Sequence, residues 1–236
     1  MNVLAIDTSN QVLGVAVSKN DEIQAEYTVN IKRNHSIGLM PAIDHVMRET
    51  NLTPPDQLER IVVAKGPGSY TGVRIGLSTA KTMAWTLDIP PIVAVSSLEL
   101  LAHNARQQHG LISPFFDARR GLVYTGLYEN SRDRIFLKKE DQNINLEQWL
   151  DELKAYQKPV VFLSQDIRIH QSLIVEKLKN DAVIPSPIDH LPRPGILALL
   201  GSQKNPEAIH QLTPNYIRLV EAEANWLKEQ EKKQND

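Results

Sequence analysis

The stretch KGPGSYTGVRIG, residues 65–76, combines four glycines and one proline in twelve residues. It follows the apolar run RIVVA, residues 60–64, which is typical of a buried strand, and it leads into an apolar helical pattern. A strand, a glycine-rich turn and a helix N-terminus are the parts of a phosphate-binding site. The stretch therefore predicts either a phosphate site that does chemistry or a turn that only shapes a surface.

Composition narrows the classes of protein to which the chain can belong. Of its 236 residues, 42% are apolar and 23% are charged, which is typical of a soluble globular protein. The net charge of −2 provides no global field that would capture nucleic acid unaided. The absence of cysteine excludes disulfides and thiol chemistry. Because the apolar runs are too short for a signal peptide or a membrane span, we expect a cytoplasmic protein without membrane contact.

On both sides of the glycine-rich stretch, the patterns alternate between strands and helices. Short turns join the first three strands, which is typical of an antiparallel meander. The predicted strands cover residues 3–6, 12–17, 23–29, 61–64 and 92–95, and the predicted helices cover 36–50, 71–87 and 96–107. This order predicts an α/β domain with a mixed five-stranded sheet and helices on its faces.

A similar but weaker pattern begins after residue 105. It predicts strands at 122–128, 134–137 and 160–163 and helices at 146–153 and 196–201. We assign residues 1–105 to a first domain, together with a returning segment, about 206–236, that contains a C-terminal helix near 218–232. Residues 106–205 would form a second, smaller domain.

Six segments resemble the bacterial TsaB (YeaZ) family of tRNA threonylcarbamoyladenosine biosynthesis proteins. They are LAIDTSN at 4–10, NHSIGLMPAI at 34–43, GPGSYTGVRIGLSTAK at 66–81, VSSLELLA at 95–102, FFDARRGLVY at 115–124 and PNYIR at 214–218. The resemblance implies two domains of the actin-like ATPase (ribonuclease H-like) fold, the second of them degenerate. It also implies a complex with the catalytic subunit TsaD and the small ATPase TsaE, which modifies N6 of adenosine 37 in tRNA. The chain would then meet tRNA indirectly, through that complex.

A nucleotide site would draw on two turns of the first domain and one turn of the second. Its candidate residues are Asp7, Thr8, Ser9, Gly66, Gly68, Ser69 and Asp117. The turn after Asp7 contains no glycine, so we favour an interpretation in which Asp7 and Ser9 satisfy backbone groups. Pro67 removes one amide donor from the glycine-rich turn, where Ser69 or Thr71 can cap the helix that follows.

The second domain offers weak support for a complete site. Two arginines follow Asp117, and Arg193, Pro194 and Gly195 stand where the fold normally carries a paired-glycine adenosine loop. We therefore expect no cofactor bound by this chain alone, with ATP or ADP at a composite site in the complex. Arg119 and Arg120 could meet an acidic partner or a tRNA phosphate, although a salt-bridged surface turn is the simpler interpretation.

Metal ligands are also missing from the expected position. TsaD carries a pair of metal-binding histidines on a helix, and the resemblance places Ser97 and Leu101 at those positions. Leucine cannot ligate a metal and serine is a poor ligand. We expect no metal site, no catalytic residue and no enzyme activity of the chain itself.

Two helices provide the predicted partner interface. Residues 36–50 and 71–87 carry apolar side chains on more than one face, and the resemblance implies that these helices meet TsaD or a second copy of the chain. Gly72, Gly76 and Ala80 recur every four residues and would leave a ridge for another helix. The predicted interface residues are His35, Leu39, Met40, Ile43, Met47, Tyr70, Gly72, Val73, Arg74, Gly76, Leu77, Ala80 and Met83.

Arg74 lies in the first turn of its predicted helix, where positive charge opposes the helix dipole, so we expect an acidic partner on another subunit. Simple burial of both helices beneath the rest of the chain is the alternative. Three functions remain open at this point. The chain is a non-catalytic scaffold of the modification complex, a small-molecule kinase or ATPase that uses Asp7 and residues 65–72, or a homodimeric binding module.

Overall fold

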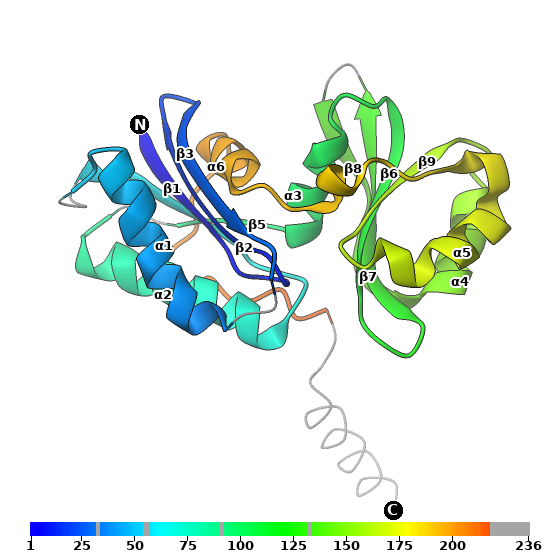
Figure 1. Cartoon of the computed structure of the whole chain (residues 1–236), viewed down its shortest axis with the longest axis horizontal. Coiled ribbons are helices and arrows are strands. Elements are labelled where there is room, and N and C mark those ends of the chain that lie inside the picture. Colours follow the sequence, from blue (N-terminus) through cyan, green and yellow to red (C-terminus); the bar gives the residue numbers. More distant parts are fainter. Residues whose placement is uncertain (32–33, 54–56, 90–91, 132–133, 218–236) are drawn as a thin grey trace, which may run out of the picture.

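The computed structural model describes residues 1–31, 34–53, 57–89, 92–131 and 134–217. Within these ranges the chain forms two domains that lie side by side, each built on a five-stranded sheet (Figure 1). The predicted C-terminal helix, near residues 218–232, lies outside the described residues.

The sheet of the first domain begins with an antiparallel meander. Strands β1 (Asn2–Asp7), β2 (Leu13–Lys19) and β3 (Glu22–Val29) pair antiparallel, whereas β4 (Arg60–Ala64) and β5 (Val93–Val95) extend the sheet in parallel with β1. The strand order is β3-β2-β1-β4-β5. The predicted mixed five-stranded sheet is confirmed.

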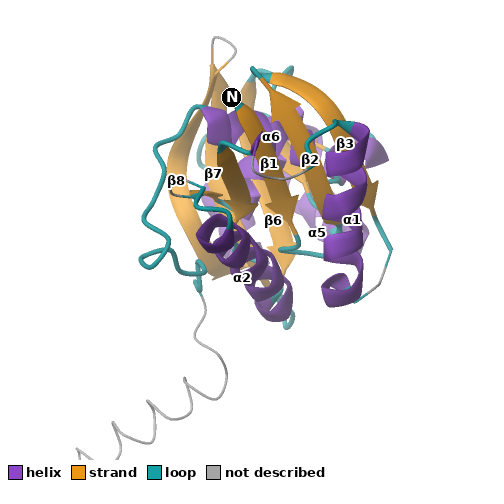
Figure 2. Ribbon diagram, turned by 90° about the vertical axis from the view of Figure 1, so that its left-hand side faces the viewer, coloured by secondary structure: helices purple, strands orange, loops and turns teal. Residues whose placement is uncertain are grey.

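Two helices cover one face of this sheet. Helix α1 (His35–Glu49) is capped by Asn34, and α2 (Tyr70–Thr86) is capped by Ser69, whose side chain accepts a hydrogen bond from the Gly72 amide. Figure 2 shows α1 and α2 next to each other in front of the strands. Their inner sides pack on β1, β2 and β4 in the largest apolar core of the domain.

A third helix covers the opposite face of the same sheet. Helix α6 (Pro194–Ser202) packs its Leu197 and Ala198 against Val3 and Val62. The prediction assigned these residues to the second domain, and the structure places them on the first. An apolar helix that follows an irregular passage has no local signal that shows which sheet it covers.

The chain after α6 also belongs to the first domain. The Glu207 amide bonds the carbonyl of Ile92, Leu212 is 1% exposed in the core of α1 and α2, and the Asn215 amide bonds the carbonyl of Lys65. The second domain is therefore an insertion, as predicted, but it ends before α6 rather than at residue 205.

The second domain repeats the sheet of the first. Its strands are β6 (Gly110–Asp117), β7 (Leu122–Ser131), β8 (Arg134–Asn145), β9 (Val160–Leu163) and β10 (Ala182–Val183). Their order is β10-β9-β6-β7-β8. Read from the other edge, β8-β7-β6-β9-β10, it matches the order β3-β2-β1-β4-β5 of the first sheet strand for strand. This duplicated arrangement confirms the two ribonuclease H-like domains of the actin-like ATPase fold.

Helices α4 (Leu146–Lys154) and α5 (Ile167–Leu178) pack on one face of this second sheet, where Phe115, Trp149 and Phe162 are fully buried. The prediction includes α4 but not α5. The three short helices η2 (His103–Ala105), η3 (Lys179–Asp181) and η4 (Pro187–His190) complete the described helical elements.

Helix α3 (Ser97–Ala102) connects the domains. Its Leu98 and Leu101 pack against Ile112 and Tyr128 of the second domain, whereas Leu100 contacts the α6 side of the first. The α-helix ends five residues before the predicted end at 107, because the chain tightens into η2. Among the described residues, no helix has both the length and the apolar character needed to cross a membrane.

Candidate functional site

The glycine-rich stretch packs closely against the chain's own turn at residues 8–9. A Cβ atom on Gly68 would lie 2.0 Å from the carbonyl oxygen of Ser9, and one on Gly72 would lie 2.1 Å from the carbonyl oxygen of Thr8. A Cβ atom on Gly76 would lie 2.6 Å from Thr8 Oγ1. The ridge of Gly72, Gly76 and Ala80 therefore faces the chain's own sheet, and the expectation that another helix approaches it is wrong.

Three amides of the glycine-rich turn are used inside the chain. The Ser69 amide donates to the Ser9 carbonyl at 2.7 Å, and the Gly72 amide donates to Ser69 Oγ at 3.2 Å. The Gly66 amide donates to Ser97 Oγ at 3.1 Å, and Pro67 has no amide hydrogen. A phosphate cradle needs several free amides that converge on one point. With three amides bonded within the chain and none on Pro67, this turn offers few of the donors that such a cradle needs.

Asp7 is sealed in the same corner. It is 1% exposed, and its Oδ1 accepts hydrogen bonds from the Ser9 amide at 2.8 Å and from Ser9 Oγ at 2.7 Å. Thr8 Oγ1 donates to the Gly72 carbonyl at 2.7 Å. Burial raises the pKa of Asp7, and the two bonds from Ser9 partly oppose that shift. The interpretation of Asp7 and Ser9 as a backbone-satisfying turn agrees with this geometry.

A cleft of about 770 Å³ opens between the two domains beside this corner. Of the predicted nucleotide residues, Gly68, Ser69 and Asp117 line it, together with Asn10 and Asp166. The remaining candidates, which are Asp7, Thr8, Ser9 and Gly66, lie outside its lining. The structure thus brings one turn from each domain to a shared cleft but keeps the buried carboxylate of Asp7 away from it.

Asp117 is held by neighbours of its own domain. His170 Nε2 lies 2.9 Å from Asp117 Oδ1, and the Asp117 amide donates to Asp166 Oδ2 at 3.0 Å. The His170 ring also meets the ring of Phe115 edge-on, with centroids 5.7 Å apart. These contacts fix Asp117 in position at the edge of the cleft.

Asp166 and His170 are functional-site neighbours that the prediction missed. Both follow β9, and β9 is the parallel neighbour of β6, which ends at Asp117. Carboxyl ends of parallel neighbours meet at the same edge of a sheet. The polar run Ser164-Gln165-Asp166 directly after a buried strand was the signal that could have revealed them.

The two positions that align with the TsaD histidines have structural roles here. Ser97 supports the glycine-rich turn through its bond with the Gly66 amide, and Leu101 is fully buried against the second domain. Among the described residues, no group of three or more His, Cys, Asp or Glu side chains has the arrangement to hold a metal ion.

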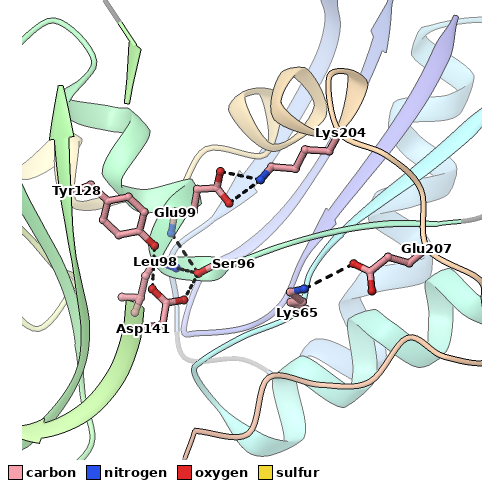
Figure 3. A network of polar contacts seen from close by, with 8 residues as sticks. All are labelled: Lys65, Ser96, Leu98, Glu99, Tyr128, Asp141, Lys204 and Glu207. Atoms are coloured by element: carbon pink, nitrogen blue, oxygen red, sulfur yellow. Dashed lines mark hydrogen bonds and ion pairs between the residues drawn. The ribbon is translucent and has the colours of Figure 1, made fainter. Parts of the chain in front are cut away.

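A polar network joins the two domains beside α3 (Figure 3). Asp141 Oδ2 accepts from Ser96 Oγ at 2.5 Å, and Asp141 Oδ1 accepts from the Tyr128 hydroxyl at 2.8 Å. Glu99 of α3 pairs with Lys204 at 2.8 Å. Burial raises the pKa of Asp141, and burial together with the nearby Asp141 carboxylate raises that of Tyr128. The prediction missed this network because Asp141 lies within a charged run that is typical of a solvated surface.

Helices α1 and α2 bury most of the predicted interface residues inside the chain. The buried members are Leu39, Ile43, Met47, Gly72, Val73, Gly76, Leu77 and Ala80. Met40 is 52% exposed and Tyr70 40%, Arg74 is also exposed, and His35 and Met83 are partly exposed. Ile37, which is 74% exposed, was not predicted. The buried members position the outer surface of the two helices rather than forming it.

Arg74 finds its partner within the chain. Its Nε donates to the Tyr216 hydroxyl at 2.5 Å, and its guanidinium lies 3.8 Å from the centroid of the Tyr70 ring. The Tyr70 and Tyr216 rings stack with centroids 5.3 Å apart. A tyrosine pair of the same chain therefore takes the place of the acidic intersubunit partner that we expected.

Comparison with known proteins agrees with this architecture. Residues 22–226 match the family model described as TsaD: tRNA N6-adenosine threonylcarbamoyltransferase. The tRNA threonylcarbamoyladenosine biosynthesis protein TsaB of Bacillus subtilis (strain 168) is 50% identical, over 98% of this chain and 100% of its own length. TsaB of Buchnera aphidicola subsp. Schizaphis graminum (strain Sg) is 31% identical over 75% of this chain and 86% of its own.

Among solved structures, YeaZ from Pseudomonas aeruginosa superimposes with a TM-score of 0.75 at 23% identity, over 91% of this chain and 99% of its own. At 23% sequence identity, this similarity supports a shared fold and does not by itself indicate a shared function. With the matches to TsaB over nearly the full length and the family model shared with TsaD, the chain belongs to the TsaB (YeaZ) family and has its actin-like ATPase fold.

Proposed function

We propose that this chain is a non-catalytic scaffold subunit of the complex that makes threonylcarbamoyladenosine in tRNA. In this role it binds and activates a TsaD-type catalytic subunit, together with a TsaE-type ATPase, in the cytoplasm. Membership of the TsaB family supports involvement in that biosynthesis. The closed corner of Asp7, Gly68 and Gly72 supports the non-catalytic part, because Asp7 Oδ1 and the amides of Ser69 and Gly72 are already engaged within the chain.

The outer surface of α1 and α2 is the proposed docking site for the catalytic subunit. Ile37 and Met40 of α1 are mostly exposed, and Tyr70 of α2 adds an exposed aromatic ring. Clustered exposed apolar side chains on neighbouring helices are typical of a protein interface. Two helices from a partner would complete a four-helix bundle on this surface. The same surface suits a second copy of the chain, so a homodimer would compete with the complex.

Any ATP or ADP would lie at a composite site in the complex. Gly68 and Ser69 line the first-domain side of the interdomain cleft and Asp117 the second-domain side, and a partner subunit would supply the phosphate donors. Transfer of the threonylcarbamoyl group and contact with the metal would belong to the catalytic subunit.

The test is threonylcarbamoyl transfer to tRNA by purified TsaD and TsaE, with and without this chain. Met40→Glu places a charge on the proposed docking surface, and we expect it to weaken TsaD binding about tenfold or more and to abolish the stimulation. Ile169→Glu is a matched control, because Ile169 is an apolar residue that is 67% exposed on α5 of the other domain. This control substitution should change neither the affinity for TsaD nor the stimulation of threonylcarbamoyl transfer.

The kinase alternative makes the opposite prediction. If this chain alone turns over ATP, and Asp7→Asn removes that turnover while Met40→Glu does not, the scaffold proposal is wrong. The homodimer alternative predicts that Met40→Glu converts a dimer to a monomer in analytical ultracentrifugation without any effect of the chain on tRNA modification.

A further inference from the structure

A second cleft, of about 910 Å³, opens on the side of the first sheet that carries α6. Its walls come from β3 and α6 of the first domain, from α3 and the segment after η2, and from the beginning of β8 in the second domain. Figure 1 shows α6 behind the strands, on the far side from α1 and α2. The cleft is therefore accessible while a partner covers the docking surface.

Positive charge predominates in this cleft although the whole chain is slightly acidic. The lining contains Arg106, Arg134, Arg193 and Lys204, against two carboxylates, Glu26 and Glu99. Lys204 Nζ pairs with Glu99 at 2.8 Å, and Arg193 pairs with Glu26 at 3.5 Å. Burial lowers the pKa of His103, another lining residue, so its ring adds no charge at neutral pH.

Two guanidinium groups remain after these pairs are formed. Arg106 and Arg134 are both exposed, and among the described residues no carboxylate lies within ion-pair distance of either. Both belong to the second domain, since Arg106 follows η2 and Arg134 begins β8. Two arginines that line one cleft without a carboxylate partner among the described residues are suited to an extended polyanion, because each can contact a different phosphate.

An exposed aromatic ring lies in the same lining. Phe136 is 52% exposed, two residues after Arg134, and Ile135 lies between them. A groove that combines cations with an exposed aromatic ring is typical of surfaces that bind single-stranded nucleic acid, where bases stack on the ring. An acidic polypeptide would use the cations but would gain less from the ring.

We infer that this cleft binds the phosphodiester backbone of an RNA strand through Arg106 and Arg134, with Phe136 as a platform for a base. That the polyanion is RNA rests on the proposed function, and the direct contact goes beyond it. The chain then contributes its own RNA contact on the face opposite to the one that meets the catalytic subunit.

Binding is measured by fluorescence anisotropy of the full chain with a labelled tRNA transcript and a labelled twelve-nucleotide single-stranded RNA. We expect Arg106→Ala and Arg134→Ala each to weaken binding and to lower the slope of log K against log salt by about 0.7 for the single strand. Arg106→Glu combined with Arg134→Glu should weaken binding at least about tenfold. Arg168→Ala, an exposed arginine on α5 outside the cleft, is the matched control and should change neither value.

Phe136→Ala separates the aromatic contribution from the charge. It should weaken binding of the single strand about fivefold or more and leave the salt slope unchanged. A polyglutamate peptide of equal charge is the probe for the acidic-polypeptide alternative. If polyglutamate binds as tightly as the single strand, or if the double charge reversal leaves RNA affinity unchanged, the inference is wrong.

The same variants distinguish this inference from the proposed function. Wild-type RNA affinity in the charge-reversed variant, together with normal TsaD binding, refutes the RNA contact only. Lost RNA affinity in that variant, with no binding of TsaD by the wild-type chain, refutes the scaffold proposal only. Circular dichroism of each variant verifies that the fold is retained.

Discussion

The two domains share a strand order, yet each joins the end of its first strand to a neighbouring helix by a different contact. In the first domain, the turn after β1 packs against the start of α2 through Gly68 and Gly72. In the second domain, the turn after β6 meets the first turn of α5 through the pair of Asp117 and His170. The first contact requires glycines, which have no side chain to keep the backbones apart. The second contact is made by two polar side chains, Asp117 and His170.

This difference explains why one corner is closed and the other borders a cleft. Backbone that approaches within van der Waals contact of a helix leaves no room for water or a ligand. A carboxylate paired with a histidine keeps a polar, partly exposed edge, and Asp117 lines the interdomain cleft. A glycine-rich sequence after a strand is therefore compatible with two opposite outcomes, an open anion site or a tightly packed turn.

The largest expected effect comes from filling the closed corner. Gly72→Ala would place a Cβ atom 2.1 Å from the Thr8 carbonyl oxygen, which requires a shift of backbone against backbone. We expect a loss of about 3 kcal/mol or more in the free energy of unfolding, measured by urea denaturation.

Gly38→Ala is the matched control, because Gly38 is also a helical glycine but its added Cβ atom would meet only Leu13 Cδ1 at 3.2 Å. Higher helix propensity offsets that contact, so the change should be within about 1 kcal/mol. Equal effects of the two substitutions would show that the closed corner has no special role.

The polar corner of the second domain should be less sensitive. His170→Ala removes the bond to Asp117 and the edge-on contact with Phe115. We expect a loss of about 1–3 kcal/mol in the free energy of unfolding. His170→Gln keeps a donor for the carboxylate and should recover part of the loss. If His170→Ala lowers the free energy of unfolding more than Gly72→Ala does, the polar contact of the second domain is the more important of the two for stability.

The polar network beside α3 should be less sensitive still. Tyr128→Phe removes the hydroxyl that donates to Asp141 but keeps the buried ring (Figure 3). We expect a loss of about 1 kcal/mol. A double-mutant cycle with Asp141→Asn measures the coupling between the two residues, and a value of zero would show that they act independently.

The smallest expected effect concerns the buried carboxylate of the first corner. Since burial raises the pKa of Asp7 above 3.8, the folded state holds the proton more tightly than the unfolded state does. The free energy of unfolding should therefore fall as pH rises from 3.8 through the folded-state pKa. Asp7→Asn should flatten that part of the profile, with little change in the amount of folded protein at neutral pH.

If Asp7→Asn leaves the pH profile between pH 3 and pH 7 identical to that of the unsubstituted chain, Asp7 is not the sealed acid described above.

Much of the fold follows from local patterns, because period-two and helical apolar repeats identify the first meander, strands β7 and β9, and helices α1, α2 and α4, whereas no strand was predicted at β6. Two failures share one physical cause. Helix α5 was missed, and α6 was assigned to the wrong domain, because an apolar repeat reports that a face is buried but not against what. The site shows the same limit. Ser69 and Ser97 were recognisable as polar residues at helix starts, whereas the Asp117–His170 and Asp141–Tyr128 contacts join residues far apart in sequence.

The late position of α6 in the chain has a consequence for how the protein is made. Val3, Val62 and Val93 belong to the first strands to leave the ribosome, yet the helix that covers them begins only at Pro194. The second domain contains all of its strands by Val183 and can fold first during synthesis. The domain that is translated first is therefore completed last, and its uncovered apolar face is the natural target for a chaperone on the nascent chain.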